Sequence, residues 1–341
     1  MGGVFVTEVF KQLTVCLPTY HGLETLGPAL DSIFAQSAGD YEIVIGNDSP
    51  DDHEEVEAFL KKINDPRIRL LKNERNLGYP DNIKKIVSAA KHDVLFFMCQ
   101  DDVLLSNNIF SKALGIFTDH PDVGAITRPY YWFKHDLNKP IRLIEKYPKN
   151  IISADGDEES IDKLFETLGQ LTGLIMRKSL ITHDFIEHIF PCHAAPFLSI
   201  IKTHKVYLWE DYMIAVRTTH SQTQLSRIYN PSPTFTWINM FKNVFPEPQF
   251  DKIRSLGIEK FSTNYLGLVQ IKNYGFFRDY CADVYHLVKE RKRNLISPKF
   301  WFYFLGTLLI PRVVLRRLVG IFKDTLGNQH ASRKIPELTE G

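Results

Sequence analysis

Residues 94–103 read VLFFMCQDDV, an apolar run that ends in the adjacent carboxylates Asp101 and Asp102. Strands buried in a parallel sheet have this pattern, and open α/β folds bind ligands beyond the carboxyl ends of such strands. Two hard oxygen donors at this place favour Mg²⁺ or Mn²⁺, and such an ion favours a diphosphate. The alternative is a solvated turn in which Asp102 or Ser106 caps the next helix.

Strand-like and helix-like segments alternate through the first 127 residues. Apolar runs predict strands over residues 13–17, 41–45, 67–71, 94–98 and 123–127, and helical spacing predicts helices over 23–36, 82–90, 107–117 and after the NDSPDD turn. This alternation is typical of βαβ units. The sequence therefore predicts an α/β fold with a doubly wound, mainly parallel sheet flanked by helices.

The composition is that of a folded chain without a strong global charge. At 341 residues, with 44% hydrophobic and 24% charged residues, the chain is long enough for roughly two domains. A net charge of +1 gives no field for nucleic acid, so no such partner is expected. The four cysteines form no CxxC pair, which argues against a zinc site and a disulfide framework and favours a reduced cytoplasm. We expect no signal peptide and no membrane-spanning helix.

The second half of the chain is less regular. Between residues 129 and 162 the periodicity fades, which predicts an insertion over the sheet. Residues 171–176 and 206–209 are strand-like, and residues 211–218 are expected to open a helix. Turn-rich stretches after residue 229 mark a boundary. We expect an α/β domain over residues 1–228 and a mostly helical region over 229–341.

An amphipathic stretch lies within this helical region. Residues 299–310 read KFWFYFLGTLLI and residues 312–323 read RVVLRRLVGIFK. Such a run is too short to cross a bilayer core about 30 Å thick, but an aromatic and basic amphipathic segment can lie among the headgroups. The alternative is a helix packed on the domain or in a homodimer interface. We expect residues 299–323 to bind a membrane surface.

Four loops follow strands that are expected to lie side by side. They are PTYHG (18–22), GNDSPDD (46–52), NERNLGYPDN (73–82) and CQDD (99–102), and together they would surround one crevice. The ring of Tyr20 could stack on a base, or it could simply pack within the loop. Asp48 could accept a hydrogen bond from a pyrimidine imide, or act as a turn residue.

Taken together, these segments resemble the family 2 glycosyltransferases, which have the GT-A fold. The resemblance covers roughly residues 12–225, and its matching stretches are TVCLPTYHGLETLGPALDSIFAQS, YEIVIGNDSPDD, NERNLGYPDNIKKIVSAAKHDVLFFMCQDDVLL and WEDYMIA. It implies a nucleotide-sugar-binding catalytic domain over residues 1–228.

The resemblance also assigns roles to individual residues. The nucleotide site would be formed by Pro18, Thr19, Tyr20, Asp48, Asn82 and Asp101. Asp101 and Asp102 would stand in the DXD position and hold a divalent Mn²⁺ or Mg²⁺ ion on the diphosphate. Asp211, with Glu210 beside it, would be the general base that deprotonates the acceptor hydroxyl. For these two acids the alternative is a helix N-terminus that favours negative charge.

The sequence departs from the family pattern at three places. Asn47 precedes Asp48 where many relatives have two acids, so only one carboxylate can face the base. Cys99 replaces the first acid of the DXD motif, and Asp81 stands where many relatives have Arg. A positive contact to the nucleotide is then missing or comes from Arg75. These changes bear on metal affinity and donor identity.

Three functional hypotheses follow. The first is an inverting, metal-assisted hexosyltransferase-type enzyme that moves a sugar from a UDP- or dTDP-linked donor to a hydroxyl of a glycan or lipid-linked glycan. It would work in bacterial surface-polysaccharide assembly, such as lipopolysaccharide or capsule, as a cytoplasmic protein peripheral on the inner face of the cell membrane. The second is a sugar-nucleotide nucleotidyltransferase, although PTYHGLE lacks the Gly-rich, basic phosphate loop of that class. The third is a non-catalytic membrane-surface scaffold with the same fold, which retention of four acids opposes.

Overall fold

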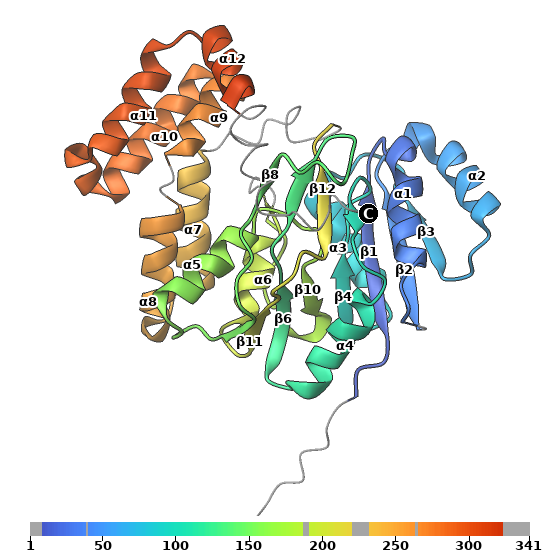
Figure 1. Ribbon diagram of the computed structural model, residues 1–341. Helices are drawn as coiled ribbons and strands as arrows, with labels where there is room; N and C mark the ends of the chain where they lie inside the picture. Colours follow the sequence, from blue (N-terminus) through green and yellow to red (C-terminus); the bar gives the residue numbers. More distant parts are fainter. Residues whose placement is uncertain (1–8, 39, 187–190, 220–231, 263–264, 323–341) are drawn as a thin grey trace, which may run out of the picture.

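The computed structural model describes residues 9–38, 40–186, 191–219, 232–262 and 265–322 (Figure 1). The strands are β1 (Leu13–Thr19), β2 (Tyr41–Asn47), β3 (Ile68–Lys72), β4 (Val94–Phe97), β5 (Val103–Leu104), β6 (Val123–Thr127), β7 (Tyr131–Phe133), β8 (Arg142–Leu143), β9 (Asn150–Ile152), β10 (Ile175–Arg177), β11 (Lys205–Leu208) and β12 (Ile214–Arg217). The α-helices are α1 (Leu23–Phe34), α2 (His53–Ile63), α3 (Tyr79–Ala89), α4 (Ile109–Asp119), α5 (Glu158–Thr167), α6 (Ala194–Ile200), α7 (Pro233–Val244), α8 (Asp251–Leu256), α9 (Leu266–Tyr274), α10 (Phe277–Glu290), α11 (Pro298–Leu309) and α12 (Arg312–Phe322).

Two sheets organise the first part of the chain. The larger has eight strands in the order β3-β2-β1-β4-β10-β6-β11-β9, and the smaller has the order β5-β12-β7-β8. In the larger sheet β1, β2, β3 and β4 are parallel, as are β6 and β11, while β10 and β9 are antiparallel to their neighbours. The predicted α/β fold with a mainly parallel sheet is confirmed.

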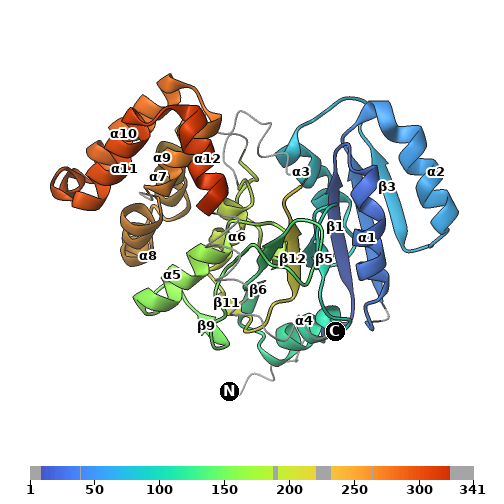
Figure 2. The same ribbon diagram turned by 45° about the horizontal axis from the view of Figure 1, so that its top comes forward.

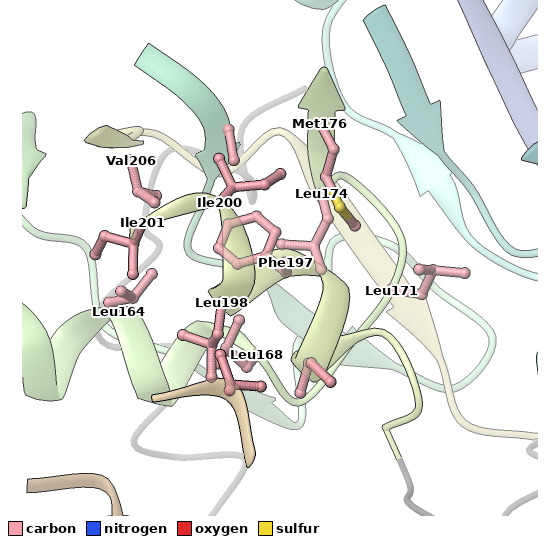
Figure 3. Close-up of a cluster of buried hydrophobic side chains, with 14 of the residues drawn as sticks. Leu164, Leu168, Leu171, Leu174, Met176, Phe197, Leu198, Ile200, Ile201 and Val206 are labelled. Atoms are coloured by element: carbon pink, nitrogen blue, oxygen red, sulfur yellow. The ribbon is translucent and has the colours of Figure 1, made fainter. Parts of the chain in front are cut away.

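Helices cover both faces of the large sheet. Side chains of β1 alternate between the two sides: Val15 and Leu17 pack with α1, α2 and α4, and Cys16 packs with α3, α5 and α6. Figure 3 shows the second side, where Phe197 and Leu198 of α6 lie among leucines of the 164–174 segment. This packing on both faces fixes the carboxyl ends of the parallel strands at one edge.

Two sequence expectations differ from the structure. Residues 211–218 do not open a helix: they lead into strand β12, which pairs with β5 and β7. Its residues Ile214, Ala215 and Val216 are all buried, and a short apolar run of this kind has no periodicity that separates strand from helix. The 129–162 segment is not irregular throughout, because it supplies β7 and β8 to the small sheet and β9 to the large one.

The C-terminal region is helical in its described residues, as predicted, and divides by packing. Side chains of α7 and α8, such as Phe241 and Ile253, belong to the same hydrophobic core as the sheet. Helices α9, α10 and α11 have a separate small core around Leu268, Tyr280 and Phe300. Figure 2 shows this helical unit at the end of the molecule opposite α2 and β3.

Candidate active site

The loops expected to form one crevice follow adjacent strands. The order β3-β2-β1-β4 places the segments after these four strands along one edge of the sheet (Figure 1). Pro18 and Thr19 end β1 and pair in parallel register with Gly46 and Asn47 of β2. The structure therefore brings together the loops that carry Tyr20, Asp48 and Asp101.

Gln100 fastens the loop after β1 to the loop after β4. Its side-chain oxygen accepts hydrogen bonds from the Thr19 hydroxyl and from the Tyr20 backbone N–H, at 2.7 Å for the latter. Its amide nitrogen donates to the Tyr20 carbonyl at 3.1 Å. A Cβ at Gly22 would lie 2.0 Å from the Gln100 amide oxygen, so a glycine is needed beside it. Gln100 is not recognisable as a site residue from the sequence, because an amide between Cys99 and Asp101 indicates no chemistry by itself.

Tyr20 is half-buried in the loop after β1, at this edge of the sheet. Its ring lies edge-on against His21, with 4.2 Å between the ring centroids. His21 has a positive φ of 45°, an uncommon conformation outside glycine, and its N–H donates to the Ser49 hydroxyl at 2.7 Å. The β1 loop is thus held on two sides, by Gln100 and by Ser49, while part of the Tyr20 ring stays exposed for stacking.

Asp48 organises the loop after β3. The residue is 3% exposed, and its carboxylate accepts hydrogen bonds from the Asn73 amide at 2.8 Å, the Leu77 N–H at 2.8 Å and the Gly78 N–H at 2.9 Å. The predicted contact to a nucleotide base therefore has to share a carboxylate that already holds three protein donors. These hydrogen bonds favour a role for Asp48 in shaping the loop after β3.

Asn82 is also committed to the protein. It is 2% exposed, donates to the Gly46 carbonyl at 2.8 Å and accepts from the Asn73 amide at 3.0 Å. These bonds tie the start of α3 to β2 and to the loop that Asp48 holds. The side chain predicted to bind nucleotide is thus buried and bonded to protein groups.

Two of the three positions that depart from the family pattern, Cys99 and Asn47, are occupied by neutral groups with structural partners. Burial raises the pKa of the Cys99 thiol, whose sulfur lies 3.8 Å from the Tyr79 hydroxyl. The thiol stays protonated near neutral pH, and only a thiolate is a metal ligand. The Asn47 amide donates to Asp52 at 2.7 Å and its oxygen accepts from the Ser49 N–H at 3.1 Å.

Asp102 is a buried carboxyl with both oxygens engaged. The residue is 1% exposed, and it accepts hydrogen bonds from the Thr172 hydroxyl and, at 3.0 Å, from the Arg217 N–H. Burial, followed by the charge of Asp101, raises its pKa well above the usual range. A buried carboxyl with both oxygens hydrogen-bonded is suited to holding the loop after β4 in place and poorly suited to binding a metal ion.

Arg128 lies behind Asp102 and is fully buried at the end of β6. Its guanidinium donates to the carbonyls of Thr167 at 3.1 Å, of Gln170 at 3.0 Å and of Thr172. Burial lowers its pKa to about 10, which leaves it charged at neutral pH. Gly173, with φ of 82°, leaves space for it, since a Cβ there would lie 2.6 Å from its Nε. Arg128 thereby holds the 167–172 loop, and Thr172 of that loop holds Asp102.

Asp101 and Arg217 form the more accessible part of this edge. Asp101 is half-buried, and its backbone carbonyl accepts a hydrogen bond from Arg217 Nε at 3.2 Å. The Arg217 guanidinium lies 4.6 Å from the centre of the Phe133 ring of β7. Arg217 therefore places a cation beside the backbone of Asp101, at the predicted diphosphate position. Arg75, the alternative source of this charge in the sequence, is exposed in the loop after β3.

Asp211 and Glu210 lie after β11 and are both exposed. The Asp211 carboxylate is 3.2 Å from the Lys146 ammonium. Arg217, which donates to Asp102, is six residues further along a largely extended segment. The described ion pair of Asp211 is with Lys146, and its role as the base stays a prediction.

The donor groups at this edge fit a metal ion that is shared with substrate phosphate. Among the described residues no group of three or more His, Cys, Asp or Glu side chains could hold an ion. Mg²⁺ and related ions are commonly held by one or two carboxylates together with phosphate oxygens and water. Asp101 is the more exposed of the two acids, and Asp102 would have to give up its present hydrogen bonds to bind an ion.

Comparison with known proteins agrees with this architecture. Residues 14–180, just under half of the chain, match the model of the family described as Glycosyl transferase family 2. A curated relative, the uncharacterized protein MT1568 of Mycobacterium tuberculosis (strain CDC 1551 / Oshkosh), is 32% identical over 127 residues, which span 37% of this chain and 38% of that protein.

Solved structures with the same fold cover most of the chain. Residues 1–349 of S. aureus TarS in complex with UDP superpose with a TM-score of 0.58 at 14% identity, covering 87% of this chain and 88% of TarS 1–349. The mannosyltransferase PcManGT from Pyrobaculum calidifontis, in complex with GDP-Man and Mn²⁺, gives a TM-score of 0.52 at 11% identity and covers 92% of this chain and 87% of that one. The likeness establishes the GT-A fold.

Proposed function

Since residues 14–180 of this chain are a family 2 glycosyltransferase domain with the GT-A fold, we propose that the protein transfers a sugar from a nucleoside diphosphate to a hydroxyl of a glycan acceptor. The donor class is supported by the structural neighbours, which were solved with UDP, UDP-GlcNAc or GDP-Man. A pyrimidine donor, UDP- or dTDP-linked, is proposed from the sequence, in which a single acid, Asp48, stands in the loop after β2.

The observation that carries the proposal is the pairing of Asp101 with Arg217 at the edge where the nucleotide loops meet. Arg217 donates to the Asp101 carbonyl through Nε only, and no other hydrogen bond of its guanidinium involves a described residue. Its remaining N–H groups can bind diphosphate oxygens, for which a guanidinium fork is well shaped. We assign to Arg217 the stabilisation of the negative charge that develops on the departing diphosphate.

The proposed reaction is a direct displacement at the anomeric carbon. The acceptor oxygen forms a bond to that carbon, the bond to the diphosphate oxygen breaks, and the nucleoside diphosphate leaves with the electron pair. The acceptor proton passes to a base that must lie within about 3 Å of the attacking oxygen. Asp211, with Glu210, stays the sequence-based candidate for this base. A single direct displacement would invert the anomeric configuration.

A divalent ion, Mn²⁺ or Mg²⁺, would neutralise the diphosphate as a Lewis acid when bound. Asp101 is the residue we expect to hold it. Asp102, with both oxygens hydrogen-bonded and a raised pKa, is better assigned to positioning Asp101 and Arg217 than to the metal.

We further propose a glycan or lipid-linked glycan as the acceptor, in bacterial surface-polysaccharide assembly, with the enzyme peripheral on the inner face of the cell membrane. Support comes from the aromatic and basic sequence of residues 299–323. Of these, residues 299–322 are described, and Lys323 lies outside the described residues.

A non-catalytic scaffold is the competing function. Cys99 and Asn47, both neutral and both with structural partners, are the observations in its favour. A scaffold does not require a guanidinium fixed beside the backbone of a half-buried acid. Nucleotide binding followed by donor hydrolysis or transfer separates the two.

The first test is a thermal-shift panel of UDP, dTDP, GDP and CDP, each with and without Mn²⁺. A ligand at 100 times its dissociation constant stabilises the fold by about 2.7 kcal/mol. We expect one pyrimidine diphosphate to raise Tm, and Mn²⁺ to enlarge the shift.

Two variants make this test specific. Asp101→Asn should abolish the enlargement by Mn²⁺, and Arg217→Gln should weaken nucleotide binding with and without metal. Asp31→Asn, on the exposed face of α1, is the matched control and should behave as wild type. If no nucleotide changes the Tm of the wild type, the donor site is wrong and the scaffold hypothesis takes its place.

A further inference from the structure

Helix α11 exposes a continuous apolar face. Trp301, Phe302, Leu305, Leu308 and Leu309 are exposed, with Phe302 and Leu309 each at 74%. Their spacing of one, three and four residues places them on one side of the helix, while Phe300 and Thr307 on the other side are buried. Soluble monomers rarely leave a contiguous face of this kind in water.

Helix α12 carries a second apolar face. Val313, Val314, Leu318 and Ile321 are exposed, with Val313 at 80%, and their spacing again places them on one side, where Arg317 also lies. On the opposite side, Arg312 Nε and Arg316 Nε donate to the Asn273 carbonyl at 2.7 Å and 3.1 Å. This carbonyl lies at the C-terminal end of α9, where a helix attracts cations. The apolar side of α12 is therefore turned away from its packing partner.

The charge around these two faces has one sign. Between Arg291 and Phe322 the sequence has seven Lys or Arg residues and no Asp or Glu. Lys299 and Arg317 are exposed on α11 and α12 themselves. A second copy of the same surface would bring these cations against each other, whereas an anionic bilayer would pair with them.

The length and the position of the helices agree with a surface location. No described helix is long and apolar enough to span a bilayer. The 12 residues of α11 measure ~18 Å, less than a hydrocarbon core of about 30 Å. In Figure 1, α12 lies toward the same end of the molecule as the carboxyl ends of the parallel strands.

We propose that the exposed apolar faces of α11 and α12, which we call the α11–α12 face, lie in the headgroup region of an anionic membrane, with Lys299 and Arg317 on its phosphates. This deepens the proposed function, because it identifies the surface that would hold the enzyme beside a lipid-linked acceptor. It rests on residues that the nucleotide site does not contain.

The test is co-sedimentation of the full chain with vesicles of phosphatidylcholine alone and of phosphatidylcholine with phosphatidylglycerol. We expect binding that is at least tenfold tighter to the anionic vesicles and falls with salt. The double variant Phe302→Ser with Leu309→Ser should lose at least tenfold in affinity, and Arg317→Glu at least fivefold.

Matched controls are Tyr285→Ser, an exposed aromatic of α10, and Lys62→Glu, an exposed charge of α2 at the opposite end of the molecule. Both should bind vesicles as wild type does. Equal binding to both vesicle types, or no effect of the α11–α12 substitutions, overturns the proposal. So does a wild-type dimer in sedimentation velocity that Phe302→Ser converts to monomer, since a second copy would then cover this face.

The membrane proposal and the donor proposal fail separately. Nucleotide-dependent Tm shifts are measured without vesicles and should be unchanged in the Phe302→Ser and Leu309→Ser variant. If the wild type binds anionic vesicles but no nucleotide, the membrane proposal is supported and the transferase proposal is contradicted.

Discussion

The edge of the large sheet buries polar side chains, and the α11–α12 face exposes apolar ones. At the sheet edge, Arg128 and Asp102 are charged or titratable groups buried in the protein, each with hydrogen-bond partners. On the α11–α12 face, Phe302 and Leu309 are apolar groups left exposed. Each arrangement opposes folding and therefore calls for an explanation outside stability.

The difference teaches that the two regions are built for partners of different kinds. A buried polar network is rigid, and it fixes a few donors and acceptors in place for a small charged ligand. An exposed apolar face has no fixed geometry to offer and suits a broad, fluid partner. The comparison predicts that substitutions at the sheet edge act through stability and geometry, and that substitutions on α11 and α12 act through binding alone.

The largest effect is expected at Arg128. Arg128→Met leaves the carbonyls of Thr167, Gln170 and Thr172 without their buried donor, and each unsatisfied group costs about 1–3 kcal/mol. We expect the free energy of unfolding in urea to fall by at least about 3 kcal/mol. Arg75→Met in the exposed loop should change it by less than about 0.5 kcal/mol.

The same measurement on Leu309→Ser sharpens the comparison. The side chain is 74% exposed, so its loss should leave the free energy of unfolding within about 0.5 kcal/mol of wild type. A large loss of stability in Leu309→Ser, or a small one in Arg128→Met, would contradict the division between the two regions.

The pH dependence of stability should report the buried carboxyl of Asp102. Its pKa in the folded protein is raised by burial above the usual value of 3.8, so folding favours the protonated form. The stability of wild type relative to Asp102→Asn should be greatest below about pH 4 and should decrease as the pH rises through the raised pKa. Urea unfolding of both proteins between pH 4 and pH 8 measures this difference. A difference that grows with pH would mean a lowered pKa and an ion-paired Asp102.

The sequence could predict this edge only in part. Asp48, Asp101 and Asp102 were found because each directly follows an apolar strand, and strand order in a βαβ fold brings such ends together. The groups that hold them are remote: Thr172 lies 70 residues from Asp102, and Arg217 lies 115 residues from it. No local pattern marks them, because they meet only through the antiparallel strand β10 and through the β5–β12 pair.

The error over residues 211–218 has a related cause. An acidic pair before an apolar stretch resembles a helix start, but the paired residues of β5 and β7 lie 110–112 and 84 residues earlier and turn the stretch into a strand. Their pairing puts the backbone N–H of Arg217 beside Asp102. The same register thus supplied a residue that the sequence did not reveal.

A smaller effect is expected where the β1 and β4 loops meet. Gly22→Ala would place a Cβ 2.0 Å from the Gln100 amide oxygen, and such overpacking usually costs about 1–3 kcal/mol. Gln100→Ala removes the obstructing group together with its bonds to Thr19 and Tyr20. We expect the double variant to be more stable than the sum of the single effects predicts, as measured in a double-mutant cycle. Additive effects would mean that Gln100 does not fill the space beside Gly22.

The smallest effect on stability, and the clearest one on mechanism, is expected at Asp211. Its pair with Lys146 is exposed, with side-chain exposures of 60% and 45%, so Asp211→Asn should change the free energy of unfolding by less than about 1 kcal/mol. If Asp211 is the base, kcat should fall at least a hundredfold while the nucleotide-dependent Tm shift is retained. Lys146→Met removes the same ion pair and is the control for a merely structural role. An unchanged kcat in Asp211→Asn would exclude it as the base.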